Sequence, residues 1–182
     1  MNMLRHVLTV LGMTSTVVAH QDYATGVLDD YDLVIVGPGP GDPRAGDHPK
    51  IATFRAATED LLASGTPFLS VCLGHQVLCD RLGIPLAYKD IVFQGTQSRV
   101  ALGEREEVVG FYNTFVGRVS TGSTTGGGTA LPEGVTVVSD PATGDIHLLR
   151  GPHFRGVQFH AESILTENGF ALLRDLVLEL LA

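Results

Sequence analysis

Two short, mostly apolar runs constrain the fold of this chain more than any other feature. Leu33–Val36 ends in the glycine- and proline-rich segment GPGPGDP, and Phe68–Val71 is followed at once by a helical pattern. Runs of this length bounded by turn residues are typical of strands buried on both faces. Apolar residues at helical spacing are found in 1–13, 48–65, 74–83 and 168–182. We therefore predict a three-layer α/β fold, in which flanking helices cover a mainly parallel central sheet and Leu33–Val36 is a central strand.

The middle of the chain has a different pattern. Short alternating strands are predicted over 95–102, 106–120 and 135–140, which gives the fold a small antiparallel region, and 145–151 and 155–163 form a hairpin pair. The glycine- and threonine-rich segment 121–134 is predicted to be a mobile surface loop. No repeat or boundary divides the 182 residues, so 1–182 is predicted to be one domain.

Composition excludes several classes of function. With 12 basic and 20 acidic residues the net charge is -8, which disfavours nucleic acid and anionic membranes as partners. The apolar stretches fall short of the ~20 residues that a bilayer requires, and no clear signal cleavage site is present, so a cytoplasmic protein is expected. Cys72 and Cys79 would lie about 10 Å apart along one helix, too far for a disulfide. No cluster has zinc-site spacing, so no metal is expected in this chain.

Cys72 lies where the second apolar run gives way to the helical pattern. A helix N-terminus offers free N–H groups and positive potential, which favour the thiolate form of a cysteine. An inert buried cysteine is an equally good interpretation from position alone. Cys79 has no such feature and is predicted to lie in the core.

Two further segments supply complementary chemistry. In GVQFHAES, His160 and Glu162 are two residues apart, so in an extended chain the carboxylate can orient the imidazole as a general base. In VGPGPGDP, Gly39 and Gly41 can aim amides at an oxyanion, although an ordinary tight turn is the alternative; the spacing fits neither a dinucleotide fingerprint nor a P-loop. Together with Cys72, these groups are the components of nucleophilic acyl transfer.

The segments VGPGPGDP, SVCLGHQ and VQFHAES resemble, in order and spacing, the motifs of class I (triad) glutamine amidotransferases, and the resemblance covers essentially the whole chain. PGPGDP and CLGHQ resemble the chorismate-utilising branch, which includes anthranilate synthase component II, aminodeoxychorismate synthase and the phenazine-type 2-amino-2-deoxyisochorismate synthase. Val109–Phe115, VGFYNTF, looks most like the phenazine type. The resemblance implies a class I glutamine amidotransferase-like (flavodoxin-like) fold. It also implies a glutaminase module that supplies ammonia to a chorismate-aminating synthase, as a separate subunit or a fused domain.

The resemblance implies a role for each matching residue. Cys72 would attack the γ-carboxamide of L-glutamine, and His160, held by Glu162, would transfer the proton. The backbone N–H groups of Gly41 and Leu73 would hold the oxyanion. Glutamine would be bound by Gly39, Pro40, Gly41, Gln76, Thr114 and Phe115. No cofactor is implied in this chain, and Mg²⁺ is expected in the synthase partner.

Three departures from the family pattern qualify these roles. Ser70 replaces a glycine two residues before the nucleophile, where we expect strain, and Ala161 replaces a proline. The first strand of the family, which lies inside the sheet, is absent before the N-terminal helix. Its absence would expose backbone groups of neighbouring strands and indicates a truncated gene model or a fragment of a fused polypeptide. Two alternatives therefore stay open: a catalytically weak or silent docking module, and a free-standing γ-glutamyl cysteine hydrolase.

Overall fold

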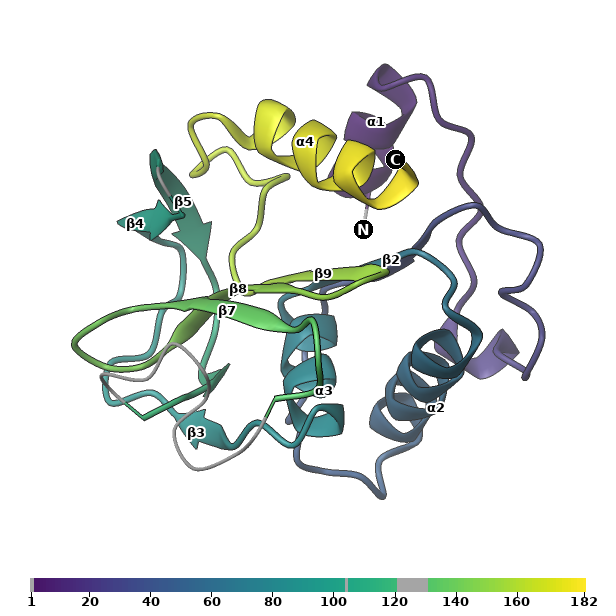
Figure 1. Ribbon diagram of the computed structural model, residues 1–182, viewed down its shortest axis with the longest axis horizontal. Helices are drawn as coiled ribbons and strands as arrows, with labels where there is room; N and C mark the ends of the chain where they lie inside the picture. Colours follow the sequence, from purple (N-terminus) through teal and green to yellow (C-terminus); the bar gives the residue numbers. More distant parts are fainter. Residues whose placement is uncertain (1, 104, 121–130) are drawn as a thin grey trace.

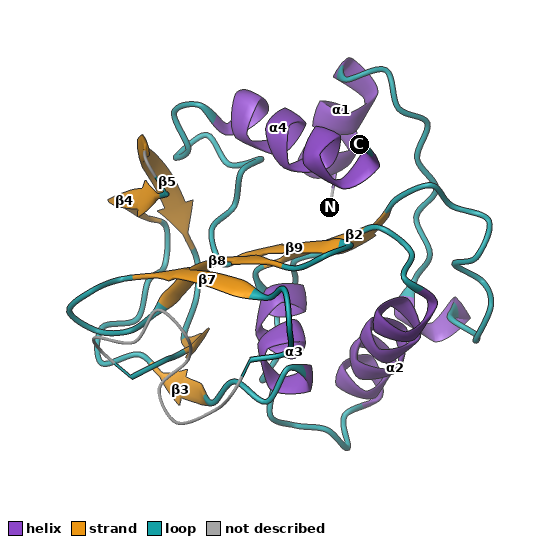
Figure 2. Cartoon of the chain, viewed as in Figure 1, coloured by secondary structure: helices purple, strands orange, loops and turns teal. Residues whose placement is uncertain are grey.

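A computed structural model of the protein describes residues 2–103, 105–120 and 131–182. Helices cover both faces of a central sheet (Figure 1). Figure 2 gives the same view with helices and strands in different colours. The sheet contains five described strands, in the spatial order β1 (Val34–Val36), β2 (Phe68–Val71), β9 (Phe154–Val157), β8 (Ile146–Arg150) and β7 (Thr136–Ser139). The three-layer α/β prediction is thus confirmed.

The central sheet is mixed rather than mainly parallel. β1, β2 and β9 are parallel to one another, whereas β8 is antiparallel to β9 and β7 is antiparallel to β8. The cause is the predicted hairpin, β8–β9, because a strand that turns back through a short connection can only pair antiparallel.

Two apolar cores hold the helices on the sheet. α1 (Asn2–Val10) and α4 (Gly169–Leu181) pack on one face, and α2 (Pro49–Ser64) and α3 (Leu73–Arg81) on the other (Figure 1). Side chains of β2 pack into both cores, because successive side chains of a strand point to opposite faces of the sheet. Leu69 and Val71 lie in the α1/α4 core, and Phe68 lies in the α2/α3 core. No helix in the described ranges is both long and apolar enough to cross a membrane.

Two small antiparallel sheets lie beside the main one. β3 (Leu86–Tyr88) pairs with β6 (Phe115–Gly117), and β4 (Thr96–Leu102) pairs with β5 (Arg105–Phe111). The strand predicted over 106–120 is therefore broken at 112–114, where the chain leaves one small sheet for the other. β3 was not predicted. Most of the predicted mobile loop, 121–130, lies outside the described residues.

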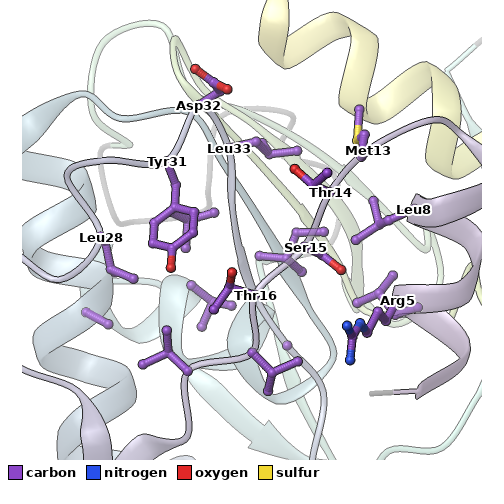
Figure 3. A pocket seen from close by; sticks show the side chains of 18 of the residues that line it. Arg5, Leu8, Met13, Thr14, Ser15, Thr16, Leu28, Tyr31, Asp32 and Leu33 are labelled. Atoms are coloured by element: carbon purple, nitrogen blue, oxygen red, sulfur yellow. The ribbon is translucent and has the colours of Figure 1, made fainter.

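The prediction that Leu33–Val36 is central is wrong, because β1 is an edge strand of the described sheet. The N–H of Val34 donates to the carbonyl oxygen of Pro67. In a parallel ladder, successive residues direct their backbone groups to opposite sides, so the N–H and C=O of Ile35 point away from β2. A groove of about 660 Å³ adjoins this edge. Figure 3 shows Thr14–Thr16 on one wall and Tyr31–Leu33 on another. In the described structure, residues 14–18 form no backbone hydrogen bond. The predicted absence of one strand would leave such a groove, and stays a prediction.

A short 3₁₀ helix, η1 (His20–Asp22), follows this segment and lies against α2, where Thr53 Oγ1 donates to His20 O at 3.2 Å.

Candidate active site

Cys72 lies at the junction of β2 and α3 in a strained conformation. Its backbone has φ 52° and ψ -102°, and it is the only described residue other than glycine with a positive φ. Such a conformation costs about 1–3 kcal/mol and is common at active sites. Hydrogen bonds from Cys72 N to Val157 O (2.9 Å) and from Gln76 N to Cys72 O (3.0 Å) hold it in place. The strained backbone thus lies at Cys72 and not at Ser70, where we expected strain.

A close approach of α3 to β1 places the GPGPG loop beside Cys72. A Cβ on Gly74 would lie 2.2 Å from the carbonyl oxygen of Val36, so only glycine allows this approach. Gly41, with φ 150°, follows in the loop, and a Cβ built on it would lie 3.6 Å from Leu73 Cδ2. Leu73 is the first residue of α3, so its N–H has no acceptor within the helix. The two predicted oxyanion residues are therefore neighbours.

His160 and Glu162 form the predicted pair. His160 Nδ1 lies 2.9 Å from Glu162 Oε1, and the two side chains are only 15% and 8% exposed. His160 N donates to Gly110 O at 2.9 Å. Thr166 Oγ1 donates to His160 O at 2.7 Å and accepts a hydrogen bond from Gly110 N at 3.0 Å. The backbone around the imidazole is thus fixed to β5.

The electrostatic environment favours the protonated form of His160. Burial alone would lower its pKa, but interaction with the nearby Cys72 sulfur and the hydrogen bond to Glu162 raise the pKa to about 9. Nδ1 is occupied by Glu162, which leaves Nε2 for the thiol, although no well-formed hydrogen bond joins Nε2 to sulfur. A raised pKa favours the imidazolium form of His160, which can donate a proton to a departing group.

Several of the predicted glutamine-binding residues are brought together. Gln76 Nε2 donates to Phe115 O at 2.7 Å, and Thr114 O accepts a hydrogen bond from Lys89 N at 2.9 Å. The Arg44 guanidinium lies 4.4 Å from the centroid of the Phe115 ring, so the loop that holds Gly39, Pro40 and Gly41 contacts the segment that holds Thr114.

The other thiol lies apart from these groups. Cys79 is fully buried, 3.6 Å from His75 Nε2, and burial raises the pKa of its thiol. Both cysteines are free, so the predictions of two separate thiols and of a core position for Cys79 are confirmed. In the described part of the chain, no group of three or more His, Cys, Asp or Glu side chains could hold a metal ion.

Three residues at the site were missed from the sequence. The Tyr112 ring packs edge-on against His160, with 5.1 Å between centroids, and its hydroxyl lies 3.0 Å from Ser163 Oγ. Gln158 Oε1 accepts from Gln76 at 3.2 Å, and Lys50 Nζ donates to Pro40 O at 2.7 Å. The only sequence signal for Tyr112 and Gln158 was their position inside VGFYNTF and VQFHAES. No sequence signal pointed to Lys50.

Comparison with known proteins places this chain in a family. The model of the family described as "Glutamine amidotransferase class-I" matches residues 1–180. The chain is 42% identical over 176 residues to "Anthranilate synthase, phenazine specific" of Pseudomonas chlororaphis, covering 97% of this chain and 27% of that protein. It is 32% identical over 148 residues to "Anthranilate synthase component 2" of Archaeoglobus fulgidus, covering 81% and 74%. The chain thus spans about a quarter of the length of the phenazine-specific relative.

A solved structure, that of a glutamine amidotransferase from Thermotoga maritima, has the same fold. Its TM-score is 0.68 at 17% identity, with 88% of this chain and 70% of that chain covered. Since the family match extends over nearly every residue, this chain belongs to the class I glutamine amidotransferase family.

Proposed function

We propose that this chain hydrolyses L-glutamine through Cys72, His160 and Glu162 and supplies the ammonia to a chorismate-aminating synthase. The observation that carries the proposal is the arrangement at the N-terminus of α3. There a strained cysteine meets a buried imidazole whose Nδ1 is bound by a carboxylate. Family membership supports the same chemistry.

In the first half-reaction the Cys72 thiolate attacks the γ-carboxamide carbon of glutamine. The carbonyl π electrons move to oxygen, and the N–H groups of Gly41 and Leu73 stabilise this oxyanion. The imidazolium of His160 donates its proton to the departing nitrogen, so that ammonia leaves and a γ-glutamyl thioester remains. Glu162 keeps Nδ1 protonated, which leaves Nε2 to carry the transferred proton.

In the second half-reaction the neutral imidazole takes a proton from water as the water attacks the thioester. Collapse of the second tetrahedral intermediate expels the Cys72 thiolate and gives glutamate, and His160 is again an imidazolium. The same oxyanion site serves both steps, because the oxygen that acquires charge is the same atom.

Exposed side chains near the proposed catalytic pair support a synthase partner. Ile164 is 94% exposed and Tyr112, which contacts His160, is also exposed. Apolar side chains beside a catalytic pair are suited to a covering protein surface, which would also keep ammonia from solvent. The names of the relatives favour a chorismate-utilising synthase, and we propose the phenazine type, with Mg²⁺ held by the synthase.

The test is glutamate release with and without the synthase, in the parent, Cys72→Ala and the control Cys79→Ala. We expect hydrolysis to require Cys72, to survive loss of Cys79 and to rise when the synthase is present. Equal rates in the parent and Cys72→Ala would refute the mechanism. Lack of hydrolysis even beside the synthase would favour a silent docking module. Partner-independent hydrolysis of other γ-glutamyl compounds would favour a free-standing hydrolase.

A further inference from the structure

Lys50 occupies an unusual position for a lysine. It lies in the first turn of α2, where the positive end of the helix dipole disfavours a cation. Burial lowers its pKa, and no carboxylate offsets that cost among the described residues. Nζ instead donates to Pro40 O at 2.7 Å and lies 5.6 Å from the centroid of the Phe54 ring. The ammonium is thus bound by a backbone carbonyl and not by a carboxylate.

The carbonyl that Lys50 binds belongs to the same peptide group as the Gly41 N–H. This peptide is trans, as are all described peptide bonds, so the N–H points opposite to the carbonyl and away from the ammonium. The bond from Nζ therefore fixes the plane of the peptide. A hydrogen bond from a charged donor also polarises the amide, which makes its own N–H a stronger donor.

Resting on the proposed function, we propose that Lys50 is a positioning residue of the oxyanion site. It orients the Pro40–Gly41 peptide and strengthens the Gly41 N–H as the donor to the tetrahedral oxyanion. Because the oxygen of glutamine carries full charge only in the transition state and intermediate, this effect accelerates the chemical step more than it tightens substrate binding.

The same helix provides a matched control. Arg55 Nη2 donates to Pro43 O at 3.2 Å, so Arg55 also holds the loop but does not touch the peptide of Gly41. Lys50→Met removes the ammonium and keeps most of the stem, Lys50→Gln removes the charge with a polar end, and Lys50→Arg keeps the charge. Arg55→Met loosens the loop without touching the Gly41 peptide, and it also breaks an ion pair with Asp80 of α3 (3.2 Å).

The experiment measures steady-state glutamate release by each variant in the presence of the synthase. We expect Lys50→Met and Lys50→Gln to lower kcat by roughly tenfold with KM for glutamine within about twofold of the parent. Loss of a whole oxyanion donor costs about 10²–10³-fold, and here the donor is weakened rather than lost. Lys50→Arg should recover most of kcat, and Arg55→Met should lie within about twofold of the parent.

Three outcomes would overturn the inference: unchanged kcat in both neutral Lys50 variants, a rise in KM at unchanged kcat, or an equal fall in kcat in Arg55→Met. Urea unfolding of each variant separates these results from misfolding, and if one neutral variant does not fold, the other decides. If the parent shows no hydrolysis that depends on Cys72, the proposed function itself fails. If hydrolysis depends on Cys72 but not on Lys50, only this inference fails.

Discussion

Gly74→Ala is expected to damage both stability and activity, although alanine normally favours a helix over glycine by about 1 kcal/mol. The added Cβ would lie 2.2 Å from Val36 O, whereas non-bonded heavy atoms rest about 3.5 Å apart. The N-terminus of α3 must therefore move by roughly 1 Å from β1. Overpacking of this kind costs about 1–3 kcal/mol, so we expect a Tm lower by about 4–8 °C for a cost near 2 kcal/mol.

The displacement should affect catalysis more than stability, because Leu73 and Cys72 lie next to Gly74. A misplacement of about 1 Å can cost 10²-fold in rate, so kcat should fall by about that factor. The assays are urea unfolding, read as a change in midpoint at constant slope, and glutamate release. The control is Gly46→Ala, whose Cβ meets only the end of the Arg55 side chain. That side chain can move at the cost of its partly exposed contacts with Pro43 and Asp80, so stability should fall by no more than about 1 kcal/mol. A Gly74→Ala variant as stable and active as the parent would refute this reasoning.

Three further variants test other parts of the structure. Glu162→Gln removes a carboxylate that raises the His160 pKa. The imidazolium should then titrate about 1–3 pH units below its value near 9, as NMR titration would detect, and kcat should fall by about 10²-fold or more; an unmoved titration contradicts the assigned pair. Ser70→Ala removes a buried hydroxyl without a hydrogen-bond partner and should stabilise the fold by about 1 kcal/mol in urea unfolding; a loss of stability would show that the hydroxyl is satisfied. Lys89→Met breaks one of the two ion pairs of the buried Asp145, which stays paired with Arg118, and should cost about 1.5 kcal/mol; a calorimetric Tm equal to that of the parent would argue against it.

The parts of the site that the sequence predicts well are those set by local geometry. The His160–Glu162 pair depends on two residues close in sequence, although they lie in a turn after β9 and not in the extended segment that we predicted. The place of Cys72 depends only on a strand that meets a helix. Both can be inferred from a few consecutive residues. The strain was assigned to Ser70 because the family has glycine there, but the conformation that requires a positive φ belongs to Cys72 itself.

The features that the sequence did not predict depend on residues far apart in the chain. The edge position of β1 follows from which strands pair with it, and no pattern within Leu33–Val36 encodes that. The break at 112–114 follows from separate pairing of β5 with β4 and of β6 with β3. Lys50 reaches Pro40 only because α2 folds back over the loop, so its contact is not visible in a motif.

Because of the groove beside it, we expect β1 to be one of the first parts of this domain to unfold locally. β1 is three residues long and is bonded on one side only, so the free energy needed to expose it is small compared with that for β2, which is bonded on both sides. The Ile35 amide faces the groove, and it should exchange its proton with solvent orders of magnitude faster than amides of β2. Any chain segment that pairs with this edge would appear as a slowing of exchange at Ile35 while the site at Cys72 is unchanged. Hydrogen exchange at the Ile35 amide therefore reports whether a further segment pairs with β1.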